Sequence, residues 1–129
     1  MKLLEIKNST KKKEDHYFGN IKKETLNNEN YRKVLFTSNN IQLVTMSLDP
    51  NEEIGLETHK NGAQFIRVEK GKAEILVGKK KHNATDGDVV IIPEGMSHNV
   101  TNIGNVDLKL YLLYAPPEHE DGVVQTNKK

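Results

Sequence analysis

The sequence predicts an all-β domain, either a sandwich or a barrel. Short β-branched and apolar segments recur along its 129 residues, and turns rich in Gly, Asn and Pro separate them at regular spacing. No segment carries apolar residues at the spacing of an amphipathic helix. A chain of this length is the size of one domain with one core.

The elements are predicted in chain order from the apolar segments and the turns between them. Residues 1–30 are polar and rich in Lys, Asn and Glu, so we expect a loose arm there, with a short strand at Leu3–Ile6 that could join a sheet edge. Residues 31–115 are expected to form the β-barrel domain. Its predicted strands are Val34–Thr37, Ile41–Leu48, Leu56–Lys60, Gln64–Glu69, Ala73–Val77, Val89–Ile92, Ser97–Thr101 and Val106–Tyr114.

The last predicted strand indicates how one face is buried. Apolar side chains alternate with other residues along it, which places Val106, Leu108, Leu110, Leu112 and Tyr114 on one face. Pro116 and Pro117 then stop the sheet, because proline cannot continue a ladder. Residues 116–129 are expected to form a polar tail over the surface or over a partner subunit.

Composition excludes several classes of function. The net charge of +1 gives no indication of nucleic acid or of a membrane surface as a partner. The basic runs Lys11–Lys13 and Lys79–Lys81 are expected to be solvated, the second at a hairpin tip. The absence of cysteine excludes thiolate metal sites, disulfides and thiol nucleophiles. No apolar stretch suits a signal peptide or a membrane span, so we expect a cytoplasmic protein.

Four polar residues are expected to converge inside the barrel. Glu57 and His59 lie two apart and therefore point to the same face of one predicted strand. Asn61-Gly62 is a hairpin signal, so that strand is expected to return as the one that carries Gln64. His98 follows a Pro-Glu-Gly turn in another predicted strand.

Such a set of side chains is typical of a metal site. Polar groups directed into an apolar interior are costly unless something satisfies them, and a divalent metal would do so. Two imidazoles and one carboxylate suit Fe, Mn, Ni or Zn, and Gln64 would add a fourth ligand or hydrogen-bond a metal-bound water. The other histidines, His16, His82 and His119, lie in polar, turn-like contexts where no functional role is expected.

Two sequence motifs frame these residues. The first reads Gly55, Glu57-Thr58-His59, Gln64 and Gly71, and the second reads Gly87-Asp88, Pro93-Glu94-Gly95, His98 and Asn102. Over residues 31–114 the chain thereby resembles the cupin superfamily. The resemblance implies a double-stranded β-helix, or jelly-roll barrel, with one metal ion bound at positions 57, 59, 64 and 98. Glu57 stands where that family usually has its first His, and Gln64 stands where it usually has Glu.

The resemblance leaves three functions open. Segment 64–69 and the ending from Leu108 to His119 resemble small phosphomannose-isomerase-type cupins, which implies a metal-dependent isomerase of a sugar or sugar phosphate. Glu57 could be its base if it is not a ligand, and Arg67, which a phosphate could use, is expected to face outward. The alternatives are a non-haem metal-dependent dioxygenase and a non-catalytic small-ligand-binding cupin. The expected partners are a small-molecule ligand and a second copy of the chain, as a homodimer.

Overall fold

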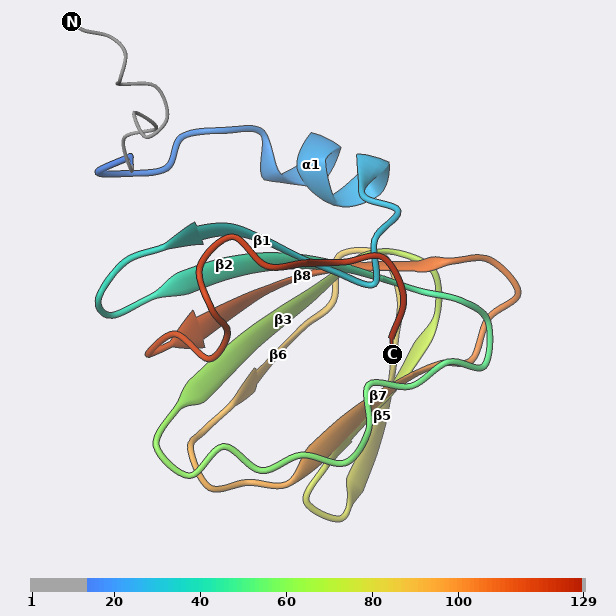
Figure 1. The fold of residues 1–129 in the computed structure, drawn as a ribbon. Coiled ribbons are helices and arrows are strands. Elements are labelled where there is room, and N and C mark those ends of the chain that lie inside the picture. Colours follow the sequence, from blue (N-terminus) through green and yellow to red (C-terminus); the bar gives the residue numbers. More distant parts are fainter. Residues whose placement is uncertain (1–13, 129) are drawn as a thin grey trace, which may run out of the picture.

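The computed structural model describes residues 14–128, which form two antiparallel β-sheets with the core between them (Figure 1). The larger sheet has the order β6-β3-β8-β2-β1-β9, and the smaller has the order β5-β4-β7. The strands are β1 (Arg32–Thr37), β2 (Gln42–Leu48), β3 (Ala63–Lys70), β4 (Ala73–Val77), β5 (Lys80–Ala84), β6 (Val89–Ile92), β7 (His98–Asn102), β8 (Leu108–Ala115) and β9 (Val124–Gln125). The predicted jelly-roll barrel is confirmed, and the predicted strand at Leu3–Ile6 lies outside the described residues.

The core consists of side chains that alternate along the strands of the larger sheet. Their fully buried apolar members on β2, β3 and β8 are Val44, Met46, Leu48, Ile66, Val68, Leu108, Leu110 and Leu112. Ile75 of β4 and Val100 of β7 close the core from the smaller sheet. Each such side chain contributes about 1.5–3 kcal/mol by leaving water. Val106, which was expected on this buried face, is 47% exposed because β8 begins only at Leu108.

At one end of the inward face, polar side chains replace the apolar ones. Tyr114 of β8 lies between Gln42 of β2 and Gln64 of β3 in the register of the larger sheet. All three side chains are buried. Because each shares its strand face with core residues, the three form a row that faces the barrel interior. The candidate functional site lies at this end.

The structure contains a helix that the sequence does not predict. Helix α1 (Ile21–Asn27) begins after Asn20, whose side chain accepts the Lys23 N–H at 3.0 Å. The helix lies over the outer face of the larger sheet, and Lys109 of β8 donates to the Asn28 carbonyl at its end, at 2.6 Å (Figure 1). Its seven residues make only two turns, too few for apolar periodicity to show. No helix of residues 14–128 is long and apolar enough to cross a membrane.

Two strands are also additional to those predicted. β5 pairs with β4 along its whole length, although four of its five residues are polar or charged and exposed. That composition resembles a loop, which is why the pattern of apolar residues does not reveal it. The Lys79–Lys81 run lies at this hairpin, as expected. β9 has only two residues and pairs with Arg32 and Lys33 of β1.

The predicted strand Leu56–Lys60 and its hairpin onto β3 are wrong. The segment between β2 and β3 joins β7 through isolated bridges, of which Glu57 with His98 is one. β3 is flanked instead by β6 and β8. Gly55 has a φ of +110°, a left-handed conformation that interrupts the extended chain just before this segment.

The residues after β8 pack back onto the barrel through Gln42. The Gln42 Oε1 accepts the backbone N–H groups of Glu118 and His119 at 3.1 and 2.9 Å, and its Nε2 donates to the His119 carbonyl at 2.7 Å. Further on, Gln125 of β9 accepts a hydrogen bond from Arg32 at 2.5 Å. The segment expected to form a polar tail therefore covers the polar end of the barrel.

Candidate metal centre

Glu57, His59 and His98 bring three potential ligand atoms together at the polar end of the barrel. One carboxylate oxygen and two imidazole nitrogens all lie within 4.8 Å of one another. Oε1 of Glu57 is 3.2 Å from Nε2 of His59 and 3.9 Å from Nε2 of His98. The two imidazole rings lie 5.2 Å apart between centroids. His98 is buried, whereas His59 and Glu57 are half-buried and border the solvent.

Backbone pairing explains why these side chains meet. The N–H of Glu57 donates to the carbonyl of His98 and the N–H of His98 donates to that of Glu57, both at 2.9 Å. Residues paired in this way hold their Cβ atoms about 5 Å apart on the same face. The Gly95 N–H also donates to the His59 carbonyl at 2.9 Å, which ties the Pro-Glu-Gly turn to the segment before β3. The sequence predicts that a hairpin with β3 brings the site residues together, but pairing of Glu57 with His98 of β7 does so instead.

His98 is oriented by its own backbone, and Gln64 lies beside it. The Nδ1 of His98 is 3.0 Å from the Met96 carbonyl oxygen, so Nδ1 carries the proton and Nε2 presents its lone pair to the site. The side-chain nitrogen of Gln64 lies 3.1 Å from that Nε2. A half-turn of the Gln64 amide would present its oxygen instead. The structure thus places Gln64 with the other three predicted residues.

A second carboxylate, that of Glu118, also contacts the site. Its Oε1 lies 3.2 Å from Nδ1 of His59, on the side of the ring opposite Glu57. A carboxylate on the outer nitrogen of a histidine fixes the ring and makes the inner nitrogen more basic. His59 and Glu118 also line a surface hollow of about 300 Å³ with residues 60–62 and 116–117. The sequence did not reveal Glu118, because it lies in a polar segment without a motif.

Tyr114 and His119 form an aromatic wall next to His59. The Tyr114 ring stands edge-on to His59 at 6.1 Å and to His119 at 5.1 Å between centroids. Burial, aided by the positive charge of Arg32 and by the neighbouring His59, lowers the pKa of His119 from 6.5 to about 4. Burial also raises the pKa of the Tyr114 hydroxyl well above its usual range. Nε2 of His119 is buried without a hydrogen-bond partner.

Other motif residues support the fold rather than the site. The Asn102 side chain donates to the carbonyls of Leu48 and Val106 at 3.0 and 2.9 Å and accepts the Gly104 N–H at 2.9 Å. Gly71 has a φ of +107°, and a Cβ there would lie 3.2 Å from the Asp107 carbonyl oxygen. Glycine is therefore required at this turn.

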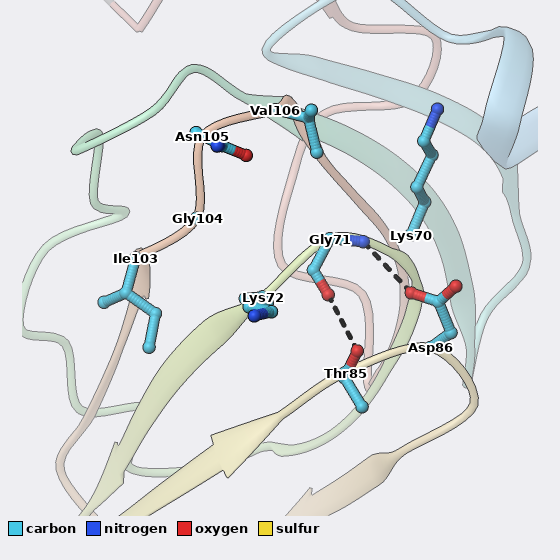
Figure 2. A pocket seen from close by; sticks show the side chains of 9 residues that line it. All are labelled: Lys70, Gly71, Lys72, Thr85, Asp86, Ile103, Gly104, Asn105 and Val106. Carbon is cyan, nitrogen blue, oxygen red and sulfur yellow. Dashed lines mark hydrogen bonds between the residues drawn. The ribbon is translucent and has the colours of Figure 1, made fainter.

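A larger hollow, of about 530 Å³, surrounds Gly71 and is a different place from the candidate site (Figure 2). Figure 2 shows the Gly71 N–H bound to Asp86 and the Gly71 carbonyl bound to the Thr85 hydroxyl. Gln64 and Lys70, at the two ends of β3, are separated by about 20 Å at the usual rise of a strand. The hollow has no imidazole in its lining, so we assign it no metal chemistry.

The donor set fits a divalent cation. Metal–nitrogen and metal–oxygen bonds are about 2.0–2.2 Å, so two ligands of one ion lie about 3–3.5 Å apart. The 3.2 Å between Glu57 and His59 has this value already, and the 3.9 Å to His98 requires only a small closure. The three side chains, with Gln64 beside them, could therefore hold one ion.

Comparison with known proteins identifies close relatives. An uncharacterized protein of Bacillus subtilis (strain 168), YrkC, is 42% identical over 115 residues, which are 84% of this chain and 62% of that protein. The chain thus spans less than two thirds of that relative. An uncharacterized protein of Acanthamoeba polyphaga mimivirus is 44% identical over 116 residues, 87% of this chain and 72% of the relative.

A solved structure and a family model agree with the fold described above. The crystal structure of BH2720 from Bacillus halodurans superimposes with a TM-score of 0.85 at 39% identity, and the match covers 87% of this chain and 89% of that one. The model of the cupin domain matches residues 44–114, more than half of the chain and most of the barrel. The chain belongs to the cupin family.

Proposed function

We propose that this cupin binds one divalent metal ion through Glu57, His59 and His98, with Gln64 as a fourth ligand or as a partner of metal-bound water. The observation that carries the proposal is the convergence of three ligand atoms within 4.8 Å at the polar end of the barrel. Fe, Mn, Zn and Ni all accept this set of donors. The ligand would be a small polar molecule that enters beside His59 and Glu118.

The reaction that we favour is a proton transfer, as in an isomerase of a sugar or sugar phosphate. When bound, a divalent ion would supply Lewis-acid polarisation of a carbonyl group. With Glu57 engaged as a ligand, the proton requires another acceptor, and Glu118 is well placed because its carboxylate is 43% exposed beside His59. The buried ring of Tyr114 would limit the access of water from the interior side.

Metal analysis of protein purified without an affinity tag tests the ligand assignment. We expect about one equivalent of metal in the wild type and a large loss in Glu57→Ala, His59→Ala and His98→Ala. The matched control is His82→Ala, which removes an exposed imidazole on β5 and should leave the metal content unchanged. If all three site variants retain the wild-type metal content, the proposed metal centre is wrong.

A dioxygenase is the second candidate, because two imidazoles and one carboxylate leave positions of the ion open for further ligands. The two reactions separate under simple conditions. An isomerase should exchange a substrate C–H proton with D₂O in the absence of oxygen, in a panel of small sugars and sugar phosphates followed by NMR. A dioxygenase should instead consume oxygen and require ferrous iron. Tight ligand binding without either reaction would identify a non-catalytic cupin.

We also propose a cytoplasmic homodimer. The outer face of β6, the edge strand of the larger sheet, carries Val89 and Ile91, which are 51% and 64% exposed, and Phe65 of β3 lies opposite Ile91. An apolar edge strand is a favourable surface for a second copy of the chain. Light scattering should give the mass of a dimer for the wild type and of a monomer for Ile91→Asp. Ile103→Asp, at an exposed loop residue, is the control.

A further inference from the structure

Arg32 is a buried cation on the inward side of β1. It is 8% exposed, and it shares its strand face with the core residue Val34. Its guanidinium lies over the Tyr31 ring at 5.1 Å and donates from Nη1 to Gln125 of β9. Its Nε is buried and has no hydrogen-bond partner. The carboxylates of the candidate site, Glu57 and Glu118, pair with His59 rather than with Arg32.

This arrangement is costly unless an anion completes it. A buried charge is normally paired, and a buried N–H without a partner loses about 1–3 kcal/mol. The Nε of Arg67, on the outer face of β3, is also buried without a hydrogen bond, but it lies 3.3 Å from the Glu69 carboxylate as an ion pair. Nε is one donor of the side-on pair with which a guanidinium binds a planar carboxylate through two hydrogen bonds. The unpaired Nε therefore indicates a missing acceptor.

The charge of Arg32 acts on the same groups that surround the candidate metal centre. Among the neighbouring charges, that of Arg32 has the largest effect on the pKa values of Tyr31, Tyr114 and His119. Its own contribution lowers each of the three, whereas burial raises the pKa of the two tyrosines overall. The negative charge of Glu57 acts on both tyrosines as well, in the opposite direction. Tyr114 in turn stands edge-on to His59. Arg32 lies opposite the inward Met46 in the register of β1 and β2, so its side chain faces the same barrel interior.

We propose that Arg32 binds the carboxylate of a small hydroxy or oxo acid whose adjacent oxygen lies at the Glu57, His59 and His98 site. The inference rests on the proposed metal centre for the position of the second oxygen, and it names a small acid as the ligand in place of a sugar phosphate. The guanidinium of Arg32 matches a planar carboxylate in shape and in charge. The other buried cation, Lys109, is engaged by Asn28 and Ser47 and cannot share a second charge.

Anion binding by purified protein tests the inference. The probes are pyruvate, its neutral methyl ester and inorganic phosphate, each titrated calorimetrically into the metal-loaded wild type and into Arg32→Met. We expect pyruvate to bind the wild type in preference to the ester and to phosphate, and to bind Arg32→Met about 10- to 100-fold more weakly. Arg32→Lys, which keeps the charge but loses the planar donor pair, should be intermediate.

Two control variants separate anion binding from a structural role. Arg67→Met removes the outward arginine and should leave pyruvate affinity unchanged. Gln125→Ala removes the partner of Arg32 on β9 and should lower the melting temperature more than the affinity. If Arg32→Met folds with normal metal content and binds pyruvate like the wild type, the inference is wrong. It is equally wrong if the wild type binds no pyruvate at millimolar concentration, or if phosphate binds more tightly.

The failure of the metal proposal would look different. In that case the wild type would contain no metal, while titration of the metal-free protein would still report any binding to Arg32. Arg32-dependent pyruvate binding without metal would support the anion site and contradict the metal centre. Loss of metal in the His98→Ala variant with retained weak pyruvate binding would support both.

Discussion

Glu118 acts on the candidate metal centre through a single contact with Nδ1 of His59. Replacing it by glutamine keeps its size but removes the charge that orients the ring. We expect Glu118→Gln to weaken metal affinity about 10- to 100-fold. Competition with a coloured chelator measures the affinity. Glu120→Gln, an exposed neighbour in the same segment, should bind metal like the wild type, and equal weakening in both variants would contradict the assigned role.

His119 predicts a dependence of stability on pH. Its pKa is lowered to about 4 in the folded protein from 6.5 in the unfolded chain, so the unfolded chain binds more protons between these values. The full stability is therefore present above pH 6.5 and is lost as the pH falls toward 4. Because the ring is only half-buried, we expect a loss of about 1–2 kcal/mol. His119→Phe keeps the contact with Tyr114 and should show a smaller loss of stability between pH 7 and 4.5 in urea unfolding.

A site residue could be predicted from the sequence where it belongs to a motif or to an alternating strand pattern. Gln64 could be assigned to the inward face because Ile66 and Val68 follow it at alternate positions. Arg32 and His119 could not be found in this way. A charged residue at the start of a strand and a histidine in a polar segment are usually exposed, and only the fold brings them inside.

At the scale of elements, Asn102 holds together the connections that surround β7. Its three side-chain hydrogen bonds, to Leu48, Val106 and Gly104, are all inside the protein. Asn102→Ala leaves two carbonyls and one N–H without partners, and we expect a loss of about 2–4 kcal/mol in the free energy of unfolding. Urea denaturation measures it. Asn105→Ala, at an exposed loop residue, should change the stability by less than about 0.5 kcal/mol.

The bounds of a strand could be predicted from the sequence only where the residues next to the strand decide them. β4 and β6 have the predicted bounds, because short apolar runs between glycine turns leave little freedom in where a strand begins. β5 was not predicted, since its side chains are polar and its pairing comes from the β4 hairpin. The false hairpin at Asn61-Gly62 has the opposite cause. A local turn signal was outweighed by pairing of the preceding segment with β7, far along the chain.

At the scale of the whole molecule, the segment after β8 is expected to be part of the folded unit. A chain that stops at Ala115 loses the residues bound by Gln42 and Arg32, and it leaves the buried Gln42 amide oxygen without the two N–H groups that it accepts. We expect a loss of more than about 3 kcal/mol, with a reduced metal content. Removal of residues 127–129 should have little effect on the melting temperature. If both truncations melt like the full chain, the segment is not required.

The hydrogen bond between Arg32 and Gln125 has a consequence for the order of folding. The two residues are 93 positions apart, so the edge of the larger sheet closes only after nearly the whole barrel has been synthesised. Until then Arg32 has neither its amide acceptor nor the cover of β9. Domains dominated by such distant pairings fold in milliseconds to seconds, rather than in microseconds. In rapid-mixing refolding experiments, the backbone amides around Arg32 should therefore be among the last to become protected from hydrogen exchange.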